Sequence, residues 1–390
     1  MKVIVAADSF NPIGGAEISS FDLLSLLADK FDVRYFTSIK DVSELEAFQK
    51  NELKGFHFFK SPHKGTRNYR GTLNTRSLIS LYRAIKEFNP NIIIFNNVSD
   101  QISYSAIYLC RLFGIKTIHV MRDTMAFTHG KFVYNKGKNK FKVSFFNELK
   151  RASIFFSPFK FLNKVFLHSL NKVICISEEL KRFMEFQGLK VDEVIYNSVT
   201  TEDINLEQIT NEDDNYVLLP GRFHYLKGSE AVIQIFLEEK IQDIKLLVTS
   251  EIERVSPSLR KKCEQAGNIK FVGWKKKDEV LKLMENAKLV IYPSIFLEPF
   301  GRVPVEAMSR KTPVVVSPYG GLPEIVENKE SGFILDPMNK NAFHSGILDI
   351  LANKDLESVG NKGFENFRKR FSTSVMIKKY IAVIARTQYE

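Results

Sequence analysis

The sequence has few cysteines and no long hydrophobic run, and both absences limit what the protein can be. Its three cysteines, Cys110, Cys175 and Cys263, are scattered and lie among apolar residues. This pattern indicates free thiols in a reducing compartment and argues against a disulfide framework or a zinc site. No run of about 18 apolar residues occurs, and the first residues, MKVIVAADSF, are typical of a strand rather than a signal peptide. We therefore expect a cytoplasmic protein.

A further absence concerns motifs that bind nucleotides or nucleic acids. No stretch carries a complete Gly-x-Gly-x-x-Gly loop, which argues against an NAD-dependent dehydrogenase. The net charge of +11 leaves nucleic acid, an anionic membrane surface or an anionic substrate as candidate partners. Because no nucleic-acid-binding module is recognisable, we expect no nucleic acid partner.

The sequence does contain a regular alternation of strand-like and helix-like segments. A chain of 390 residues exceeds what one hydrophobic core usually supports, so we expect two domains. The pattern favours an α/β protein built of two doubly wound, Rossmann-like domains with parallel sheets. Segments expected to be regular in the first half include strands at 3–7, 91–95, 116–120 and 193–197 and helices at 75–88 and 101–113.

The most informative stretch is Leu297–Pro318, LEPFGRVPVEAMSRKTPVVVSP. A helix is expected from Arg302, because Pro304 is tolerated only in a first helical turn. The amides of Phe300, Gly301 and Arg302 then lack partners within the helix, and the helix dipole adds positive potential there. This helix start is therefore suited to bind an anion.

Two glutamates flank the expected helix start. Glu298 lies on the preceding loop and Glu306 on the helix itself. Both carboxylates could accept hydrogen bonds from hydroxyl groups, such as those of a sugar and a ribose on either side of a diphosphate. The alternative is that both are ordinary surface acids.

The order of residues here and just beyond forms a longer motif. It comprises Glu298, Pro299, Phe300, Gly301, Val305, Glu306, Ala307, Met308, Thr312, Pro313, Val314, Val315, Gly320, Gly321 and Glu324. This motif resembles the donor-site signature of the retaining glycosyltransferase family 4. The chain departs from the usual pattern at Ser309, Arg310 and Lys311, where the family has a small residue and a glycine.

The resemblance implies the GT-B fold, two Rossmann-like domains that face each other across a cleft. We expect an acceptor-side domain at 1–205, a domain that binds the nucleotide sugar at 206–372, and a last helix at 373–390 that returns to the first domain. The polar, acidic segment 200–215 is the best linker candidate. No Asp-x-Asp pair occurs. This fits a site that needs no divalent metal or other cofactor, because basic side chains neutralise the leaving group.

The resemblance also assigns roles to basic residues in GRFHYLKG. It implies that Arg222 and Lys227 bind the donor diphosphate, that Glu306 holds the ribose, and that Glu298 and the amides of Phe300 and Gly301 bind the sugar or phosphate. A basic pair after a strand is otherwise more often a solvated surface.

Two spots in the first half are further candidates. Gly14 and Gly15 resemble the first loop of the family, which approaches the donor phosphates, although they could also form a plain tight turn. His119 ends an expected strand, and the resemblance gives it a place lining the sugar pocket. The alternative is a hydrogen-bonded core histidine.

The tract 131–172 is basic and aromatic, with ten basic residues against one acid, Glu148. It could lie on an anionic membrane surface, with lysines at the headgroups and phenylalanines below them. It could equally form helices that pack their aromatic side chains inside.

These observations predict a retaining glycosyltransferase that moves a hexose from a UDP- or GDP-linked donor to a hydroxyl of a glycan or lipid-linked acceptor. Surface polysaccharide or glycoconjugate synthesis is the expected process, at the inner face of the membrane. A sugar-nucleotide epimerase of the same fold and a non-catalytic subunit that binds nucleotide sugars remain the alternatives.

Overall fold

The structure is a computed structural model, and it describes residues 1–9, 15–39, 55–60, 67–134, 140–152, 157–199, 215–239, 241 and 243–389. Within these ranges the side chains of residues 15–18, 56, 67, 68 and 151 are not described. The chain divides into two compact units. Unit 1 comprises Met1–Asn197 and Met376–Glu390, and unit 2 comprises Ser198–Val375. Unit 1 is therefore built from two separate stretches of the chain.

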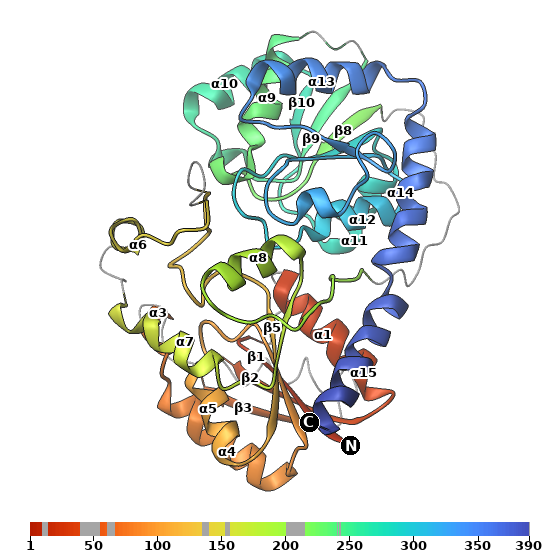
Figure 1. Ribbon diagram of the computed structural model, residues 1–390. Helices are drawn as coiled ribbons and strands as arrows, with labels where there is room; N and C mark the ends of the chain where they lie inside the picture. The colour runs from red at the N-terminus through yellow and green to blue at the C-terminus, as the bar shows by residue number, and fades with distance from the viewer. Residues whose placement is uncertain are drawn as a thin grey trace. The chain divides into compact units, whose positions relative to one another are not determined.

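Unit 1 contains a parallel seven-stranded sheet in the order β3-β2-β1-β4-β5-β6-β7 (Figure 1). Its central strands β4 and β5 are buried at every position except Lys116, as is typical of a sheet covered on both faces. Strand order reverses between β1 and β4, which is the switch point of a doubly wound sheet. The strands are β1 (Lys2–Ala7), β2 (Asp32–Ile39), β3 (Phe56–Lys60), β4 (Ile92–Asn96), β5 (Lys116–Met121), β6 (Lys172–Cys175) and β7 (Glu193–Val194).

Helices cover both faces of this sheet. Contacts of α5 with both α4 and α7 place these three helices in one layer, and α1 lies on the other side of the strands (Figure 1). The side chain of Asn74 caps α4 by accepting from the amides of Arg76 and Ser77. The helices are α1 (Gly15–Ala28), α3 (Arg67–Arg70), α4 (Thr75–Phe88), α5 (Ser105–Leu112), α6 (Phe145–Ala152), η4 (Pro158–Lys160), α7 (Phe161–Leu167), α8 (Glu178–Phe186) and α15 (Thr373–Tyr389).

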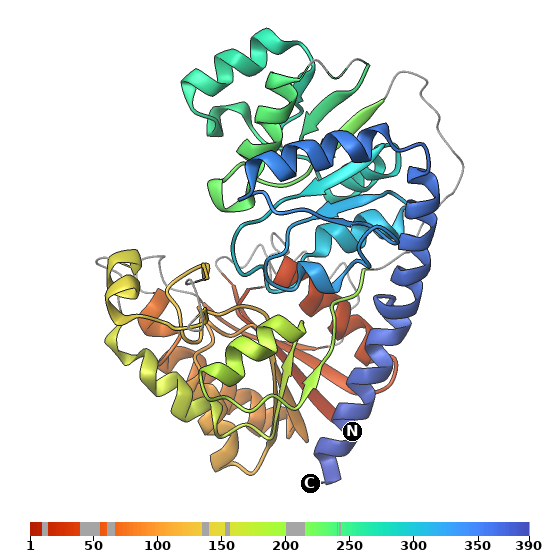
Figure 2. The same cartoon turned by 45° about the horizontal axis from the view of Figure 1, so that its top comes forward.

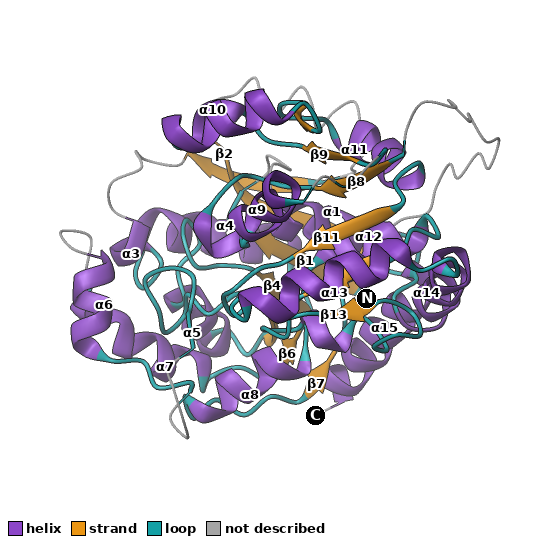
Figure 3. Cartoon of the chain, turned by 90° about the horizontal axis from the view of Figure 1, so that it is seen from above, coloured by secondary structure: helices purple, strands orange, loops and turns teal. Residues whose placement is uncertain are grey.

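Unit 2 contains a parallel six-stranded sheet in the order β10-β9-β8-β11-β12-β13. Here the order reverses between β8 and β11, so these two strands flank the switch point. The strands are β8 (Tyr216–Leu219), β9 (Lys245–Val248), β10 (Ile269–Phe271), β11 (Leu289–Tyr292), β12 (Val314–Val316) and β13 (Phe333–Ile334). The helices, several of which are labelled in Figure 3, are η5 (Tyr225–Lys227), α9 (Ser229–Glu238), η6 (Ile252–Arg254), α10 (Pro257–Ala266), α11 (Lys277–Glu285), α12 (Arg302–Ser309), η7 (Leu322–Glu324), α13 (Lys340–Ala352) and α14 (Leu356–Arg370).

The predicted fold class, α/β with two Rossmann-like parallel sheets, is confirmed. Two expected elements differ in extent. The helix expected at 101–113 begins only at Ser105, because the amides of residues 100–102 donate to the carboxylate of Asp8 instead of starting a helix. The strand expected at 193–197 is only Glu193–Val194, an edge strand.

The last helix, α15, starts in unit 2 and belongs to unit 1 from Met376 onward. Its side chains Tyr380, Val383 and Ile384 are buried. Near its end Arg386 forms a 2.9 Å ion pair with Glu193 of β7. Most of the expected linker, 200–214, lies outside the described residues.

Candidate functional site

The switch point of unit 2 brings together two of the predicted site residues. Parallel strands end at the same edge of a sheet, so the loops that follow β8 and β11 meet there. The first loop carries Lys227 in η5, and the second carries Glu298 before α12. Lys227 Nζ donates to Glu298 Oε2 at 2.7 Å, and the two side chains expose 22% and 14% of their surface. A mostly buried ion pair therefore forms from residues far apart in the sequence.

The phenol of Tyr292 completes this cluster from the last position of β11. Its hydroxyl donates to Glu298 Oε2 at 3.2 Å and accepts a hydrogen bond from Lys227 Nζ. Ser294 adds a further hydroxyl 3.3 Å from the same carboxylate oxygen. The Lys227 ammonium also lies 4.6 Å from the centre of the Tyr292 ring. We name Lys227, Tyr292, Ser294 and Glu298 the switch-point cluster.

The cluster fixes the charge of Lys227. Burial alone would lower the pKa of the Lys227 ammonium, but the Glu298 charge and the Tyr292 hydroxyl outweigh burial and raise the pKa above its ordinary value. Burial, followed by the Glu298 charge, raises the pKa of Tyr292 to about 12. Lys227 is thus a cation and Tyr292 a neutral phenol at physiological pH.

Two glycines allow the backbone to approach closely enough to form the cluster. Gly228 has φ +67°, and a Cβ there would lie 2.0 Å from the carbonyl oxygen of Pro293. Gly320 has φ +68°, and a Cβ there would lie 2.1 Å from the carbonyl oxygen of Glu298. Only glycine fits either position without moving the backbone. Gly228 thus holds the Lys227 loop against β11, and Gly320 holds the Glu298 loop.

The other predicted donor residues lie around the start of α12. Phe300 is buried and packs against Phe371, with ring centres 5.8 Å apart. Gly301 immediately precedes the helix, and Arg302 begins it. Arg302 Nε lies 3.7 Å from Glu306 Oε1 one turn later, so Glu306 faces a cation.

Arg222 occupies a more open position than Lys227. It follows β8, is exposed, and places its guanidinium 5.4 Å from the centre of the Trp274 ring. Trp274 is the only tryptophan of the chain and is itself 57% exposed. The structure therefore brings Lys227 to Glu298, while Arg222 lies against an exposed aromatic ring.

His119 lies in β5 of unit 1, and only 2% of it is exposed. Its Nδ1 is 2.8 Å from the carbonyl oxygen of Phe95, which can only accept a hydrogen bond. In the neutral ring the proton is therefore on Nδ1, and Nε2 is unprotonated. Burial, reinforced by Arg122 and opposed by the bond to Phe95, lowers the pKa of His119 to about 4. His119 is therefore neutral at physiological pH, and its role in a sugar pocket stays a prediction.

The first loop of unit 1 is described only in part. Gly14 lies outside the described residues, and Gly15 is the first residue of α1. At the switch point of this unit, Asp8 accepts from the amides of Asp100, Gln101 and Ile102 at 2.6–2.8 Å. These amides are thus already bonded to a carboxylate of the protein itself, unlike a vacant anion site.

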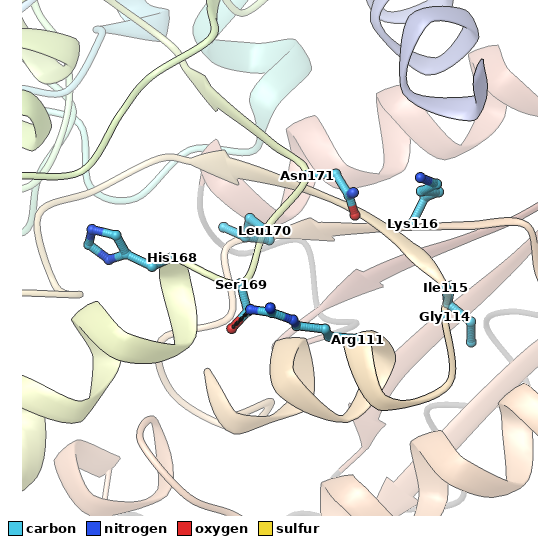
Figure 4. Close-up of a pocket in the computed structure, with 8 residues that line it drawn as sticks. All are labelled: Arg111, Gly114, Ile115, Lys116, His168, Ser169, Leu170 and Asn171. Carbon is cyan, nitrogen blue, oxygen red and sulfur yellow. Dashed lines mark hydrogen bonds between the residues drawn. The ribbon is translucent and has the colours of Figure 1, made fainter. Parts of the chain in front are cut away.

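A hollow of about 400 Å³ lies elsewhere in unit 1 (Figure 4). It surrounds Lys116 and Asn171, which stand at the amino ends of β5 and β6. Arg111 reaches from α5 toward Ser169, with Nη1 3.5 Å from its hydroxyl oxygen (Figure 4). The hollow therefore lies at the amino ends of the strands, whereas Arg222, Lys227 and Glu298 follow the carboxyl ends of theirs.

Sequence reasoning missed Tyr292 and Ser294. Both stand in the strand end LVIYPS, where an apolar run gives no indication that its last tyrosine contacts a lysine 65 residues earlier. A hydroxyl pair at the carboxyl end of a switch-point strand was the available signal.

Comparison with known families matches the two halves of the chain to two models of the same group. Residues 13–203 match "Glycosyltransferase Family 4" and residues 201–366 match "Glycosyl transferases group 1". The chain belongs to glycosyltransferase family 4. The predicted resemblance is thereby confirmed.

Among the relatives of this glycosyltransferase family 4 chain is an uncharacterised glycosyltransferase of Methanocaldococcus jannaschii. It is 31% identical over 206 residues, which are 49% of this chain and 53% of the relative, so the chain spans about half the relative's length. The capsular polysaccharide biosynthesis glycosyltransferase CapM of Staphylococcus aureus is 25% identical over 236 residues, 55% of this chain and 61% of CapM.

Solved structures confirm the GT-B fold of this family 4 chain. HepE of Anabaena, crystallised with UDP and glucose, superimposes with a TM-score of 0.72 at 18% identity, covering 99% of this chain and 100% of HepE. At this identity the likeness shows the fold alone. Within the described residues, no helix combines the length and the apolar character needed to cross a bilayer.

Proposed function

We propose that the protein is a retaining hexosyltransferase that uses a UDP- or GDP-linked sugar donor. The acceptor is a hydroxyl of a glycan or of a lipid-linked saccharide, and the product enters surface polysaccharide or glycoconjugate synthesis. One observation carries the proposal, namely the mostly buried Lys227–Glu298 pair at the switch point of unit 2. Open α/β sheets bind ligands at that point.

The switch-point cluster supplies the two functions that such a donor requires. Without donor, Glu298 balances the charge of Lys227. When a nucleotide sugar binds, the Lys227 ammonium turns to the diphosphate, and Glu298 accepts from sugar hydroxyls instead. The negative diphosphate then takes the place of Glu298 beside the ammonium, so Lys227 keeps its charge. The cluster thus stabilises the negative charge that develops on the leaving diphosphate.

The surrounding residues complete the donor site in this proposal. Arg222 is exposed and provides a second cation for the diphosphate. The amides at the start of α12 bind phosphate or sugar oxygens. Glu306, released from Arg302, accepts from the ribose hydroxyls. Gly14 and Gly15 are retained as further candidates for contact with the phosphates, as the family resemblance implies.

The reaction itself requires little beyond this placement. The acceptor hydroxyl attacks on the face from which the diphosphate leaves and gives its proton to the departing phosphate oxygen, so the configuration at the sugar is retained. Neutral His119 orients the sugar through hydrogen bonding rather than through a charge. We propose that no divalent metal or other cofactor takes part, because Lys227 and Arg222 neutralise the leaving group.

The comparisons support this proposal without fixing the donor or the acceptor. HepE was crystallised with UDP and glucose and also with UDP-glucose, which favours UDP as the nucleotide here. CapM is a glycosyltransferase of capsular polysaccharide biosynthesis, which favours a glycan or lipid-linked acceptor. We further propose that the protein acts in the cytoplasm, at the inner face of the membrane.

Thermal unfolding with a panel of nucleotides tests the proposal, because a ligand that binds only the folded state raises the melting temperature. We expect a rise with UDP or GDP and none with NAD. A Lys227→Ala variant should lose the rise. If no nucleotide changes the melting temperature, the protein is not a donor-dependent transferase. Conversion of a sugar nucleotide into its epimer without any acceptor would instead establish an epimerase.

A further inference from the structure

Three consecutive short helices of unit 1, α6, η4 and α7, expose large apolar side chains. Single exposed apolar residues are normal on a protein surface, but a group of them indicates an interaction site. We name this group the aromatic face; its members and their exposed fractions are Phe145 (61%), Phe146 (78%), Leu149 (41%), Phe159 (50%), Phe161 (66%) and Val165 (58%).

The members of the aromatic face lie on one flank of the unit. Figures 1 and 3 both place α3, α6 and α7 on the same side of unit 1, and Figure 2 shows the same segments in a turned view. Phe159 contacts Tyr69 of α3 edge to face, with ring centres 6.4 Å apart, and Tyr69 is itself 42% exposed. The apolar surface therefore extends beyond the tract 131–172 onto a neighbouring helix.

Among the described residues of the tract 131–172, the exposed charged side chains are all basic. Lys142, Lys150 and Lys164 are exposed within the same segments. The only acid of residues 131–172 is Glu148, and it is 4% exposed. Its carboxylate accepts from the backbone amide of His129 and lies 3.1 Å from His129 Nδ1. Burial of Glu148 therefore leaves the described residues of 131–172 with exposed phenylalanines and lysines and without an exposed acid.

We infer that the aromatic face is a docking surface for an anionic lipid bilayer. The combination of exposed phenylalanines with lysines matches an interface in which apolar rings enter the acyl boundary and ammonium groups bind anionic headgroups. The inference adds to the proposed function by naming which residues enter the membrane, and it rests on that function only for the acceptor.

The aromatic face is also bonded to the segment that follows β5. Besides the Glu148–His129 contact, Ser157 N donates to His129 Nε2 at 3.1 Å. Lys160 Nζ donates to the carbonyl oxygen of Met125 at 2.7 Å, and Asn163 Nδ2 donates to that of Ala126 at 2.9 Å. The helices that meet the bilayer therefore support the segment at the carboxyl end of β5, the strand of His119. A lipid-linked acceptor held in the bilayer would reach unit 1 beside this segment.

Vesicle sedimentation with the full chain tests the inference. Vesicles of phosphatidylcholine alone should pellet little protein, and vesicles with about one third phosphatidylglycerol should pellet most of it at low salt. Binding should weaken as salt screens the lysines. The triple variant Phe145→Ser/Phe146→Ser/Phe161→Ser removes apolar contacts. The triple variant Lys142→Gln/Lys150→Gln/Lys164→Gln removes positive charge.

Each lysine at an anionic surface contributes about fivefold to binding, so loss of three should reduce partitioning about a hundredfold. The phenylalanine variant should lose at least about tenfold. Two control variants outside the face should bind as the unaltered protein does. Ile79→Ser changes an exposed apolar residue of α4, and Lys261→Gln/Lys262→Gln/Lys270→Gln removes the same charge from unit 2.

Stabilisation by UDP or GDP, measured in parallel, separates this inference from the proposed function. All variants of the face should keep the melting temperature and its nucleotide response, since they leave the switch-point cluster intact. Vesicle binding that is absent, or equal in the face and control variants, would overturn the inference. So would a dimer that the phenylalanine variant dissociates, because the face would then bind a second copy of the chain.

Discussion

Lys227 depends on its neighbours for both its position and its charge. The pair with Glu298 is mostly buried, and removing one partner of such a pair leaves the other uncompensated. Tyr292 bonds to both partners at once. At the residue scale, the three side chains therefore act as one unit. The effect of a substitution on activity should still differ among them, because each contributes a different group.

We expect Lys227→Ala and Glu298→Ala to lower kcat/KM by about 100-fold or more, because each removes a charged contact made to the donor. Tyr292→Phe keeps the ring and loses only the hydroxyl, so it should cost about fivefold. Steady-state kinetics with a sugar donor of the nucleotide identified by thermal unfolding measures both effects. Full activity in the two alanine variants would contradict the site.

The pKa of His119 makes a second residue-scale prediction, on stability. A folded pKa of about 4, below the ordinary 6.5, means that folding favours the neutral ring. That stability is fully present above pH 6.5 and is lost as the pH falls toward 4. The loss should reach about 3 kcal/mol in the free energy of unfolding.

Urea unfolding at neutral and acidic pH measures this loss. A His119→Gln variant lacks the titrating ring and should lose less stability on acidification than the unaltered protein. The matched control His168→Gln changes an exposed histidine and should behave as the unaltered protein does. Equal pH dependence in all three proteins would contradict the buried neutral ring.

Backbone conformation at the switch point gives a prediction at the scale of elements. Gly320→Ala would place a methyl group 2.1 Å from the Glu298 carbonyl oxygen, so the loop before α12 must move. We expect a loss of about 2–3 kcal/mol in the free energy of unfolding together with weaker nucleotide binding.

The control for this prediction is Gly267→Ala at the end of α10. Its φ of +72° is similar, but nothing lies within 4 Å of the added Cβ. It should cost only about 1–2 kcal/mol and leave nucleotide binding unchanged. If both variants lose the same stability and both keep nucleotide binding, the close approach at Gly320 does not position Glu298.

Much of the architecture could be predicted from the sequence, because apolar periodicity and loop chemistry act locally. The helix start at Arg302 follows from Pro304 and the preceding glycine, and the structure places α12 there. The contact of Lys227 with Tyr292 could not be predicted, since it depends on β8 and β11 being neighbours in the sheet. Burial of Glu148 and the use of the 100–102 amides by Asp8 depend on tertiary packing in the same way.

The single tryptophan gives a prediction at the scale of the whole molecule. Trp274 is half exposed and lies against Arg222, which we propose binds the donor diphosphate. Nucleotide binding should move Arg222 and change the fluorescence of Trp274. Because the chain has no other tryptophan, the whole tryptophan signal comes from this residue. Titration with UDP and GDP measures this change, and Arg222→Ala should reduce it. A nucleotide that stabilises the protein without any fluorescence change would contradict the placement of Arg222.

The division of unit 1 into two stretches of chain bears on how the protein forms during translation. Unit 2 is continuous, so all of its residues are made before residues 376–389 of α15. At that stage the sheet of unit 1 lacks its final helix, and Glu193 of β7 has not yet formed its ion pair with Arg386. A nascent chain truncated after residue 375, and joined to the ribosome by a linker long enough to fill the exit tunnel, should therefore protect unit 2 from a protease while unit 1 is still cleaved.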